Sequence, residues 1–507
     1  MPTIIKTAVS KYCEQSNRRY KMNISEMTAL ETAEMIKAKK ISVKEAVNNV
    51  IDNIKKNDNK INAYITVTEE NALKDAETIQ KKIDSGEETG LFAGVPFAIK
   101  DNICTKGIRT SCASKMLENF TPIYDATVVR RIKNSDAISI GKLNMDEFGM
   151  GGSTETSYFG VVRNPCDTQR VSGGSSGGAA AAVASDEALF ALASDTGGSI
   201  RQPCSFCGVS GIVPTYGAVS RYGLIAFASS LDRIGAIGRD IKDCAAVLSV
   251  IGGYDTNDPT SVKNTSLDFS QCYDGNIKDL KIGIPENYIG FITDTEVKKK
   301  ITETIKIFSS LGAETEFFTL PLSEYAVAAY YVISCAEASS ELSRYDGIRY
   351  GYRSERAGNI SDIFVNSRSE AFGEEVKRRI MLGSFVLSKG HYDDYYKKAS
   401  QVRTMIKAEF EKAFEKYDII LAPAAPTTAY KIGENISDPL KMYLGDICTV
   451  SVSLAGNPAA VIPCGMANAL PVGVQLIGRA FDEKNIVKTA HAFQINTDFH
   501  KAGKGVV

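Results

Sequence analysis

Two glycine- and serine-rich segments carry the residues best suited to chemistry. Residues 172–178 read Ser-Gly-Gly-Ser-Ser-Gly-Gly, and residues 195–201 read Asp-Thr-Gly-Gly-Ser-Ile-Arg. Glycine has no Cβ, so the backbone in such segments can adopt positive φ and approach a substrate closely. Successive backbone N–H groups there can form a concavity that binds an anion. A serine beside that concavity is a candidate nucleophile with an oxyanion hole next to it.

Two other interpretations of these segments are flexible linkers and a phosphate-binding loop. The residues between the two segments are small and largely apolar, which predicts a buried stretch, and linkers do not bracket a core. The phosphate-loop pattern Gly-x-x-x-x-Gly-Lys-Ser/Thr is absent from the chain. Both interpretations are therefore weak.

A lysine upstream supplies a candidate base. Residues 93–102 read as a short apolar strand in which Lys100 follows the apolar run. Lysine is a poor base at its usual pKa of roughly 10.4, but burial can lower that pKa by about 3–5 units. A single lysine at a strand end is typically a solvated surface group. The hypothesis that Lys100 is a base therefore depends on the two serine segments.

A competing catalytic interpretation is the nucleophile elbow of α/β-hydrolases. Gly173-x-Ser175-x-Gly177 matches its pattern, which requires a histidine base. The chain has three histidines, all late in the sequence, and each is expected at the surface: His391, His491 and His500. The serine segment is followed by an alanine run, no clear strand precedes it, and no His-Gly-Gly oxyanion loop lies upstream. These features count against the elbow.

Taken together, Lys100 and the two serine segments resemble the amidase signature family, whose hydrolases use a Ser–Ser–Lys triad. The resemblance runs from about Ser25 to Phe493 and includes residues 143–153, 214–217 and 227–232. It implies that Ser199 is the nucleophile, Lys100 the base, and Ser175 a bridging serine that follows a cis peptide bond. It also implies an oxyanion hole at Thr196, Gly197 and Gly198.

Several segments of the C-terminal half are similar to the glutamine-hydrolysing subunits of tRNA-dependent amidotransferases within that family. They are residues 330–334, 346–351, 377–383 and 442–447. The resemblance implies that Tyr330, Arg379 and Asp446 hold free glutamine. The chemistry suits glutamine, because an arginine fork can bind its α-carboxylate and an acidic residue its α-ammonium. Without the resemblance, Arg379 would read as one more basic residue on a charged helix and Asp446 as a cap.

The same resemblance implies partners. The chain is expected to act with two other subunits in a heterotrimer and to pass ammonia to one of them. That partner would use ATP and Mg to amidate Glu-tRNA(Gln), Asp-tRNA(Asn) or both, so no cofactor is expected in this chain. The charge balance agrees, since 59 Lys and Arg face 60 Asp and Glu without a basic stripe for gripping tRNA. The alternatives are a free-standing amidase of another carboxamide and a non-catalytic scaffold.

Composition indicates an ordinary globular protein. The chain has 507 residues, of which 44% are hydrophobic and 23% charged. No apolar run approaches the roughly 20 residues of a membrane helix, and the first residues lack a signal-peptide core, so a cytoplasmic location is expected. Eleven cysteines then read as reduced thiols. Cys204 and Cys207 form the one Cys-x-x-Cys pair, and without a second pair we expect packing residues, not a metal site.

Apolar spacing predicts an α/β fold. Thr28-x-x-Glu31 and Ser42-x-x-Glu45 are capping boxes that open helices, and residues 297–308 carry a helical stripe. Residues 281–284, 418–422 and 471–477 look like strands. The resemblance implies a single domain over 25–493, with a central mixed sheet covered by helices on both faces and the site at loops beyond strand ends. Residues 1–24 and 494–507 are expected to be an extension and a tail.

A few positions depart from the pattern of the family. Ser172 stands where proline is frequent, Cys166 where a bulky aromatic residue is frequent, Val213 where lysine is usual and Ala218 where arginine is common. None belongs to the expected triad. The departures therefore bear on the likeness to the amidotransferase subunits more than on the hydrolase assignment.

Overall fold

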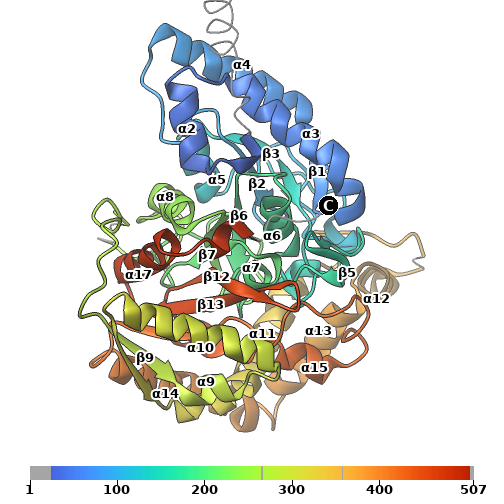
Figure 1. Ribbon diagram of the computed structural model, residues 1–507. Coiled ribbons are helices and arrows are strands. Elements are labelled where there is room, and N and C mark those ends of the chain that lie inside the picture. Colours follow the sequence, from blue (N-terminus) through green and yellow to red (C-terminus); the bar gives the residue numbers. More distant parts are fainter. Residues whose placement is uncertain (1–23, 264–266, 357, 503–507) are drawn as a thin grey trace, which may run out of the picture.

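A large mixed β-sheet forms the centre of the molecule (Figure 1). The computed structural model describes residues 24–263, 267–356 and 358–502. Within them, an 11-stranded sheet has the order β1-β3-β2-β6-β8-β7-β12-β13-β11-β9-β10. The strands are β1 (Tyr64–Val67), β2 (Pro96–Lys100), β3 (Ile138–Leu143), β6 (Phe190–Asp195), β7 (Ser210–Val213), β8 (Arg233–Gly238), β9 (Lys281–Pro285), β10 (Glu314–Phe318), β11 (Ile419–Pro423), β12 (Ala459–Ala467) and β13 (Leu470–Gly478).

The sheet combines two pairing modes. β2 runs parallel to β3 and β6, and β9 runs parallel to β10 and β11. The other neighbours pair antiparallel, including β6 with β8 and β12 with β13. β4 (Arg163–Asn164) and β5 (Asp167–Val171) form a separate hairpin-like pair. Parallel strands need covered faces, and β2, β3, β6, β9 and β11 are almost entirely buried, whereas the edge strand β10 is largely exposed.

Helices cover both faces of the sheet (Figure 1). Along β2, Phe97 and Ile99 enter one core and Ala98 enters the other, as the two-residue period of a strand requires. The first core includes α2 (Ala29–Lys37), α5 (Thr127–Lys133), α8 (Ile241–Ile251), α10 (Thr295–Ser310) and α17 (Glu483–Ile495). The predicted α/β architecture is confirmed.

Two apolar clusters lie on the opposite face. One packs α3 (Val43–Ile61), α4 (Glu69–Ser85), α6 (Gly177–Ala184) and α7 (Arg201–Cys207). The other packs α11 (Ala326–Glu341), α13 (Glu374–Leu387), α14 (Lys398–Ala413) and α16 (Val450–Ala455). The remaining helices are short or peripheral: η1 (Ile24–Glu26), η2 (Lys115–Leu117), η3 (Glu147–Gly149), α9 (Glu286–Gly290), η4 (Pro321–Tyr325), η5 (Leu342–Arg344), α12 (Ile360–Ala371), η6 (Asp393–Lys397), α15 (Pro439–Leu444) and α18 (Phe499–Ala502).

Local sequence signals account for several of these elements. Both predicted capping boxes are present, with Thr28 and Ser42 each accepting a hydrogen bond from the backbone three residues on. The stripe over 297–308 forms α10, and the three predicted apolar strands form β9, β11 and β13. Most of the predicted extension, residues 1–23, lies outside the described residues, as do residues 503–507 of the predicted tail. Within the described ranges, no helix is both long and apolar enough to cross a membrane.

Candidate active site

The sheet brings the lysine and the second serine segment to one edge. Lys100 is the last residue of β2, and Asp195 is the last residue of the neighbouring strand β6. The two strands are parallel, so their carboxyl ends open on the same side of the sheet. The first serine segment links β5 to α6 and meets the second segment there, where the backbone N–H of Ser176 donates to the carbonyl of Ser199 at 3.1 Å.

Lys100 makes direct contact with the first serine segment. Its Nζ lies 2.8 Å from Ser175 Oγ, 2.7 Å from Ser176 Oγ and 3.3 Å from the carbonyl of Ser194. The Gly174–Ser175 peptide bond is cis, as the family resemblance implied. Lys100 is fully buried, and Ser199 keeps 6% of its surface exposed. The structure therefore gathers Lys100, Ser175 and Ser199, while their separate roles stay predictions.

The surroundings of Lys100 favour a neutral amine near neutral pH. Burial lowers the pKa of Lys100 to about 7, against the opposing effect of the carboxylates of Asp146, Asp195 and Asp232. A buried amine with this pKa exchanges protons readily at neutral pH. Ser175 Oγ is the hydroxyl at hydrogen-bond distance that also lies in the expected triad.

The second segment offers backbone donors. Among the described residues, no protein acceptor receives the N–H groups of Gly197, Gly198 or Ser199. A Cβ at Gly197 would lie 2.6 Å from the hydroxyl oxygen of Tyr330, and one at Gly198 would lie 2.3 Å from Thr449 Oγ1. Only glycine fits these two positions. Because no protein acceptor binds their N–H groups, these groups are able to hold an oxyanion.

Two buried aspartates hold this segment in place. Asp195 accepts hydrogen bonds from the backbone of Ile200 and from the Arg201 guanidinium at 2.9 Å. Burial opposes its ionisation, but Arg201 prevails and lowers the pKa of Asp195 to about 2. Asp232 accepts the Thr196 hydroxyl at 2.7 Å, so the Thr196 side chain braces the segment. The expectation that Asp195 and Arg201 brace the segment agrees with these contacts.

The expected glutamine-binding residues lie on α11, on α13 and in the turn after α15. Tyr330 is buried against Gly197. Asp446 accepts a hydrogen bond from the neighbouring tyrosine, Tyr331, at 2.8 Å. Arg379 lies 5.1 Å from the centre of the same Tyr331 ring. The structure therefore connects Arg379 with Asp446 through Tyr331 and places Tyr330 against the second serine segment.

Electrostatics differ between the two expected anchors. Arg379 donates through Nε to Glu375 at 2.7 Å, and no described protein acceptor binds its two terminal nitrogens. That leaves the planar fork available for a carboxylate. Burial raises the pKa of Asp446 to about 6, while the Tyr331 hydrogen bond and Arg379 act in the opposite direction. Asp446 is thus ionised at neutral pH and able to bind an ammonium group.

Sequence reasoning missed several residues of this region. Tyr331, Glu375 and Tyr443 surround Arg379, and Tyr443 stacks on Tyr331 with ring centres 3.9 Å apart. Ser176 shares Lys100 with Ser175. The one available signal was adjacency, because these residues stand next to or one turn from expected site residues.

The structure does not meet the main requirement of the nucleophile-elbow interpretation, which is a histidine base beside the serine. A strand, β5, does precede the serine segment, contrary to expectation, and α6 follows it. However, no described histidine forms a hydrogen bond with Ser175 or Ser199: the ring of His391 lies by Phe385, that of His491 lies by Tyr273, and His500 lies on α18. His491 is buried, which corrects the expectation that each histidine lies at the surface. Without a histidine partner, Ser175 cannot act as an elbow nucleophile.

The cysteine pair serves packing. Cys204 and Cys207 are buried on α7, and neither forms a disulfide. Cys207 donates weakly to the carbonyl of Ser172 at 3.3 Å, which ties α7 to the first serine segment. Among the described residues, no cluster of His, Cys, Asp and Glu has the geometry to hold a metal ion.

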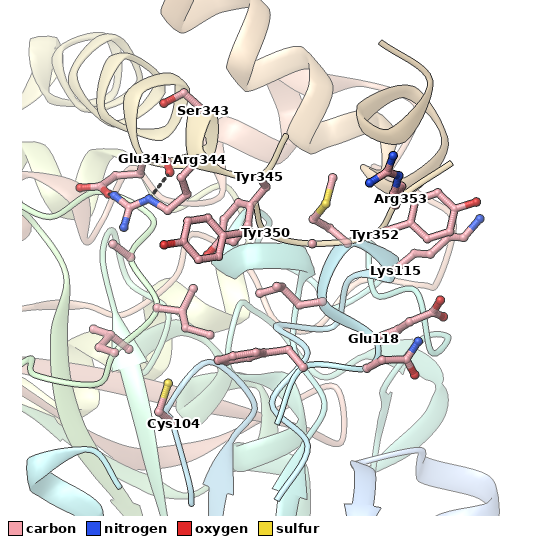
Figure 2. A pocket seen from close by; sticks show the side chains of 18 of the residues that line it. Cys104, Lys115, Glu118, Glu341, Ser343, Arg344, Tyr345, Tyr350, Tyr352 and Arg353 are labelled. Carbon is pink, nitrogen blue, oxygen red and sulfur yellow. Dashed lines mark hydrogen bonds and ion pairs between the residues drawn. The ribbon is translucent and has the colours of Figure 1, made fainter. Parts of the chain in front are cut away.

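A cavity of about 1040 Å³ opens elsewhere on the molecule (Figure 2). Figure 2 shows Tyr345, Tyr350, Lys115 and Arg344 around it, with Arg344 paired to Glu341. Neither the expected triad nor the expected glutamine-binding residues line it. Its size therefore does not make it the catalytic site.

Comparison with known proteins identifies the class. The sequence profile of the Amidase family matches residues 45–487, and the chain belongs to this family. The chain is 56% identical over 474 residues to a protein of Agathobacter rectalis, covering 93% of this chain and 94% of that one. It is 52% identical over 481 residues to a protein of Bacillus licheniformis, with 95% and 99% covered.

These two relatives share one name and one structural counterpart. Both are named as the same subunit of glutamyl-tRNA(Gln) amidotransferase, so each is one part of a larger enzyme. The crystal structure of the protein of that name from Thermotoga maritima superposes with a TM-score of 0.78 at 41% identity, covering 94% of this chain and 96% of that one. A bacterial aryl acylamidase of the amidase signature family gives a TM-score of 0.82 at 25% identity, covering 95% and 99%.

Proposed function

We propose that this chain is the glutamine-hydrolysing subunit of a tRNA-dependent amidotransferase. The observation that carries the proposal is the buried contact of 2.8 Å between Lys100 Nζ and Ser175 Oγ, at the point where the two serine segments meet. The names of the relatives supply the class of reaction. The same fold is also found in a protein named as an aryl acylamidase, so the dependence of this chain on a partner has to be tested.

The reaction begins with a proton relay. Neutral Lys100 takes the proton of Ser175, which takes the proton of Ser199 as its oxygen attacks the carboxamide carbon of glutamine. The carbonyl oxygen becomes an oxyanion and accepts hydrogen bonds from the N–H groups of Gly197, Gly198 and Ser199. Removing one such donor typically costs about 10²–10³ in rate.

The same relay then runs in reverse. Ser175 returns a proton to the leaving nitrogen, the carbon–nitrogen bond breaks, and ammonia departs from a glutamyl ester of Ser199. Water next attacks the ester with its proton passed to Ser175 and Lys100, and glutamate leaves. Each step conserves the protons held by the lysine and the two serines.

The substrate is held at its other end. The two terminal nitrogens of Arg379 bind the α-carboxylate, and Asp446 binds the α-ammonium group. Tyr331 donates a hydrogen bond to Asp446 and lies beside Arg379, so it holds the two side chains at a fixed distance from each other. This arrangement favours a free amino acid over a peptide, because a peptide bond would remove one of the two charges.

The product ammonia passes to a partner subunit. We propose a heterotrimer in the cytoplasm in which that partner binds ATP and Mg and amidates Glu-tRNA(Gln), Asp-tRNA(Asn) or both. The balanced charge of this chain fits a role in which the partner makes most of the contacts with tRNA.

Affinity purification from the native cell, followed by an amidation assay, tests the proposal. The expected result is co-purification of two further subunits and glutamine-dependent amidation of charged tRNA. The assembly carrying Ser199→Ala should lose glutamine-dependent amidation yet retain amidation with free ammonia. A chain that elutes alone and hydrolyses a different amide would support the free-standing amidase instead.

A further inference from the structure

Asp146 is joined to the bridging serine through its backbone. It is the residue that precedes η3 and is fully buried. Its backbone N–H donates to the carbonyl of Ser175 at 3.2 Å. Asp146 therefore belongs to the structure that fixes Ser175, although it stands outside both serine segments.

The side chain of Asp146 lies against the peptide group that precedes Ser175. A Cβ at Gly174 would lie 2.0 Å from Asp146 Oδ2, and one at Gly151 would lie 2.4 Å from Asp146 Oδ1. Oδ1 accepts the Thr156 hydroxyl at 2.8 Å. Oδ2 is buried and accepts no hydrogen bond of regular geometry among the described residues. Burial raises the pKa of Asp146, while the backbone of Thr154, the contacts with Thr156 and the charge of Lys100 act in the opposite direction. A buried carboxylate oxygen without a donor is costly, and a nearby positive charge can compensate for it.

The charged and titratable groups around Lys100 are few. Three carboxylates act on it, from Asp146, Asp195 and Asp232, together with the thiol of Cys112. Asp195 is already neutralised by its ion pair with Arg201. Asp232 accepts three hydrogen bonds, from Thr196 Oγ1 and from the backbone N–H groups of residues 227 and 228. Of the three, Asp146 is the one with a carboxylate oxygen that accepts no hydrogen bond of regular geometry among the described residues.

We propose that Asp146 is a positioning residue for amide hydrolysis, which holds Ser175 through its backbone and stabilises the protonated form of Lys100 through its carboxylate. This inference rests on the proposed function, in which Lys100 is the base and Ser175 the relay. Asp146 touches neither glutamine nor Ser199 in this scheme and acts through the other two residues.

The chemistry explains why such a charge is useful. When Lys100 takes the proton of Ser175, an ammonium group forms on a side chain that is fully buried. The Asp146 carboxylate stabilises that ammonium, while burial returns the amine to its neutral form once the proton leaves. Burial is the largest influence on the pKa of Lys100, and Asp146 is the first of the carboxylates that oppose it. The two effects together allow the amine to take and release a proton at neutral pH.

Asp146→Asn in the assembled enzyme tests this inference. The substitution removes the charge but retains the size and the oxygen that accepts from Thr156. Loss of an opposite charge favours the neutral lysine, so the acid limb of kcat/KM for glutamine hydrolysis should move about one pH unit lower. The plateau should fall by up to about 10-fold, because the lysine becomes a weaker base by about one pKa unit. An unmoved limb in a folded variant overturns the inference, whatever happens to the plateau.

A matched control uses another buried carboxylate. Asp255 is buried, which opposes its ionisation, but the hydroxyl groups of Ser220 and Thr127 that donate to it lower its pKa, so it carries a negative charge; it is not among the groups named above as acting on Lys100. Asp255→Asn should leave the acid limb where it is, and a shift equal to that of Asp146→Asn would also overturn the inference. Thermal unfolding checks that each variant folds.

Two further arms keep the outcomes separate. If Asp146→Asn does not fold, Thr156→Val decides, because loss of the hydroxyl donor disfavours the Asp146 anion and should move the limb the same way by less. Lys100→Met and Ser199→Ala test the proposed function itself. Full turnover by either refutes that function, whereas inactive variants beside an unmoved limb in Asp146→Asn or Thr156→Val refute the role of Asp146 alone.

Discussion

Arg379→Lys gives the sharpest test of the glutamine site. Arg379 is 2% exposed, and its guanidinium carbon lies 5.1 Å from the ring centre of Tyr331 and 5.5 Å from those of Tyr443 and Phe227. Glu375 accepts the hydrogen bond from Nε of Arg379, so the two terminal nitrogens of the guanidinium group remain available for a carboxylate. Lysine keeps the positive charge, but it cannot stack on the aromatic rings as a planar guanidinium does, and it cannot donate two parallel hydrogen bonds to one carboxylate.

The magnitude follows from the lost contacts. A lysine can replace one of the two charge-assisted hydrogen bonds to the α-carboxylate, so about 1.5–3 kcal/mol of binding free energy is lost. At 1.4 kcal/mol for each factor of ten, KM for glutamine should rise about 10- to 150-fold. The carboxamide reacts at the other end of the substrate, so kcat should change by less than about threefold.

Steady-state hydrolysis of glutamine by the assembled enzyme measures both constants. Arg378→Lys is the matched control, since Arg378 also pairs with Glu375 but its side chain is 39% exposed. We expect the control to keep the KM of the unchanged enzyme. A KM for Arg379→Lys within twofold of the unchanged enzyme would remove Arg379 from the carboxylate site, and an equal rise in the control would point to Glu375 instead.

Three further predictions concern the reacting end of the site. Ser199→Ala should abolish glutamine hydrolysis while leaving the thermal unfolding midpoint close to that of the unchanged enzyme. A measurable burst of product in the Ser199→Ala variant would exclude Ser199 as the nucleophile. Gly197→Ala should lower kcat roughly 100-fold, because its Cβ would lie 2.6 Å from the Tyr330 hydroxyl and disturb an oxyanion donor, and unchanged kcat would place the oxyanion elsewhere. The kcat/KM should rise with pH through about 7 as Lys100 loses its proton, and fall further below about 6 as Asp446 gains one; a profile flat between pH 5 and 8 (roughly the window set by those groups) would contradict both assignments.

The sequence was sufficient for the parts of the fold that have local causes. Capping boxes, helical stripes and apolar runs depend on residues within one or two turns, and they predicted α2, α3, α10 and the strands β2, β9, β11 and β13 correctly. The two serine segments could be recognised because two glycine- and serine-rich runs bracket a small, largely apolar stretch, and Lys100 was singled out only in combination with them. The cis bond before Ser175 came from the family resemblance and from no local signal.

Long-range contacts could not be predicted in the same way. Tyr331 and Asp446 are 115 residues apart in the chain, and Lys100 and Ser175 are 75 apart. Which of two adjacent tyrosines faces Asp446 depends on the rotation of α11, which is set by its packing against α13 and α14. The buried side of a helix shows in the sequence, but a rotation that exchanges Tyr330 and Tyr331 does not.

The adjacent tyrosines explain how the two ends of the site keep a fixed separation. Tyr330 packs against Gly197, and Tyr331 binds Asp446 and stacks beside Arg379. Both lie on one turn of α11, with ring centres 5.1 Å apart. A helix holds such a distance more rigidly than two loops, because each backbone group is already bonded within the helix. In the proposed site, α11 therefore links the residues expected to hold the charged groups of glutamine to the segment expected to hold the oxyanion. We expect the distance between these two ends to select the length of the amide side chain.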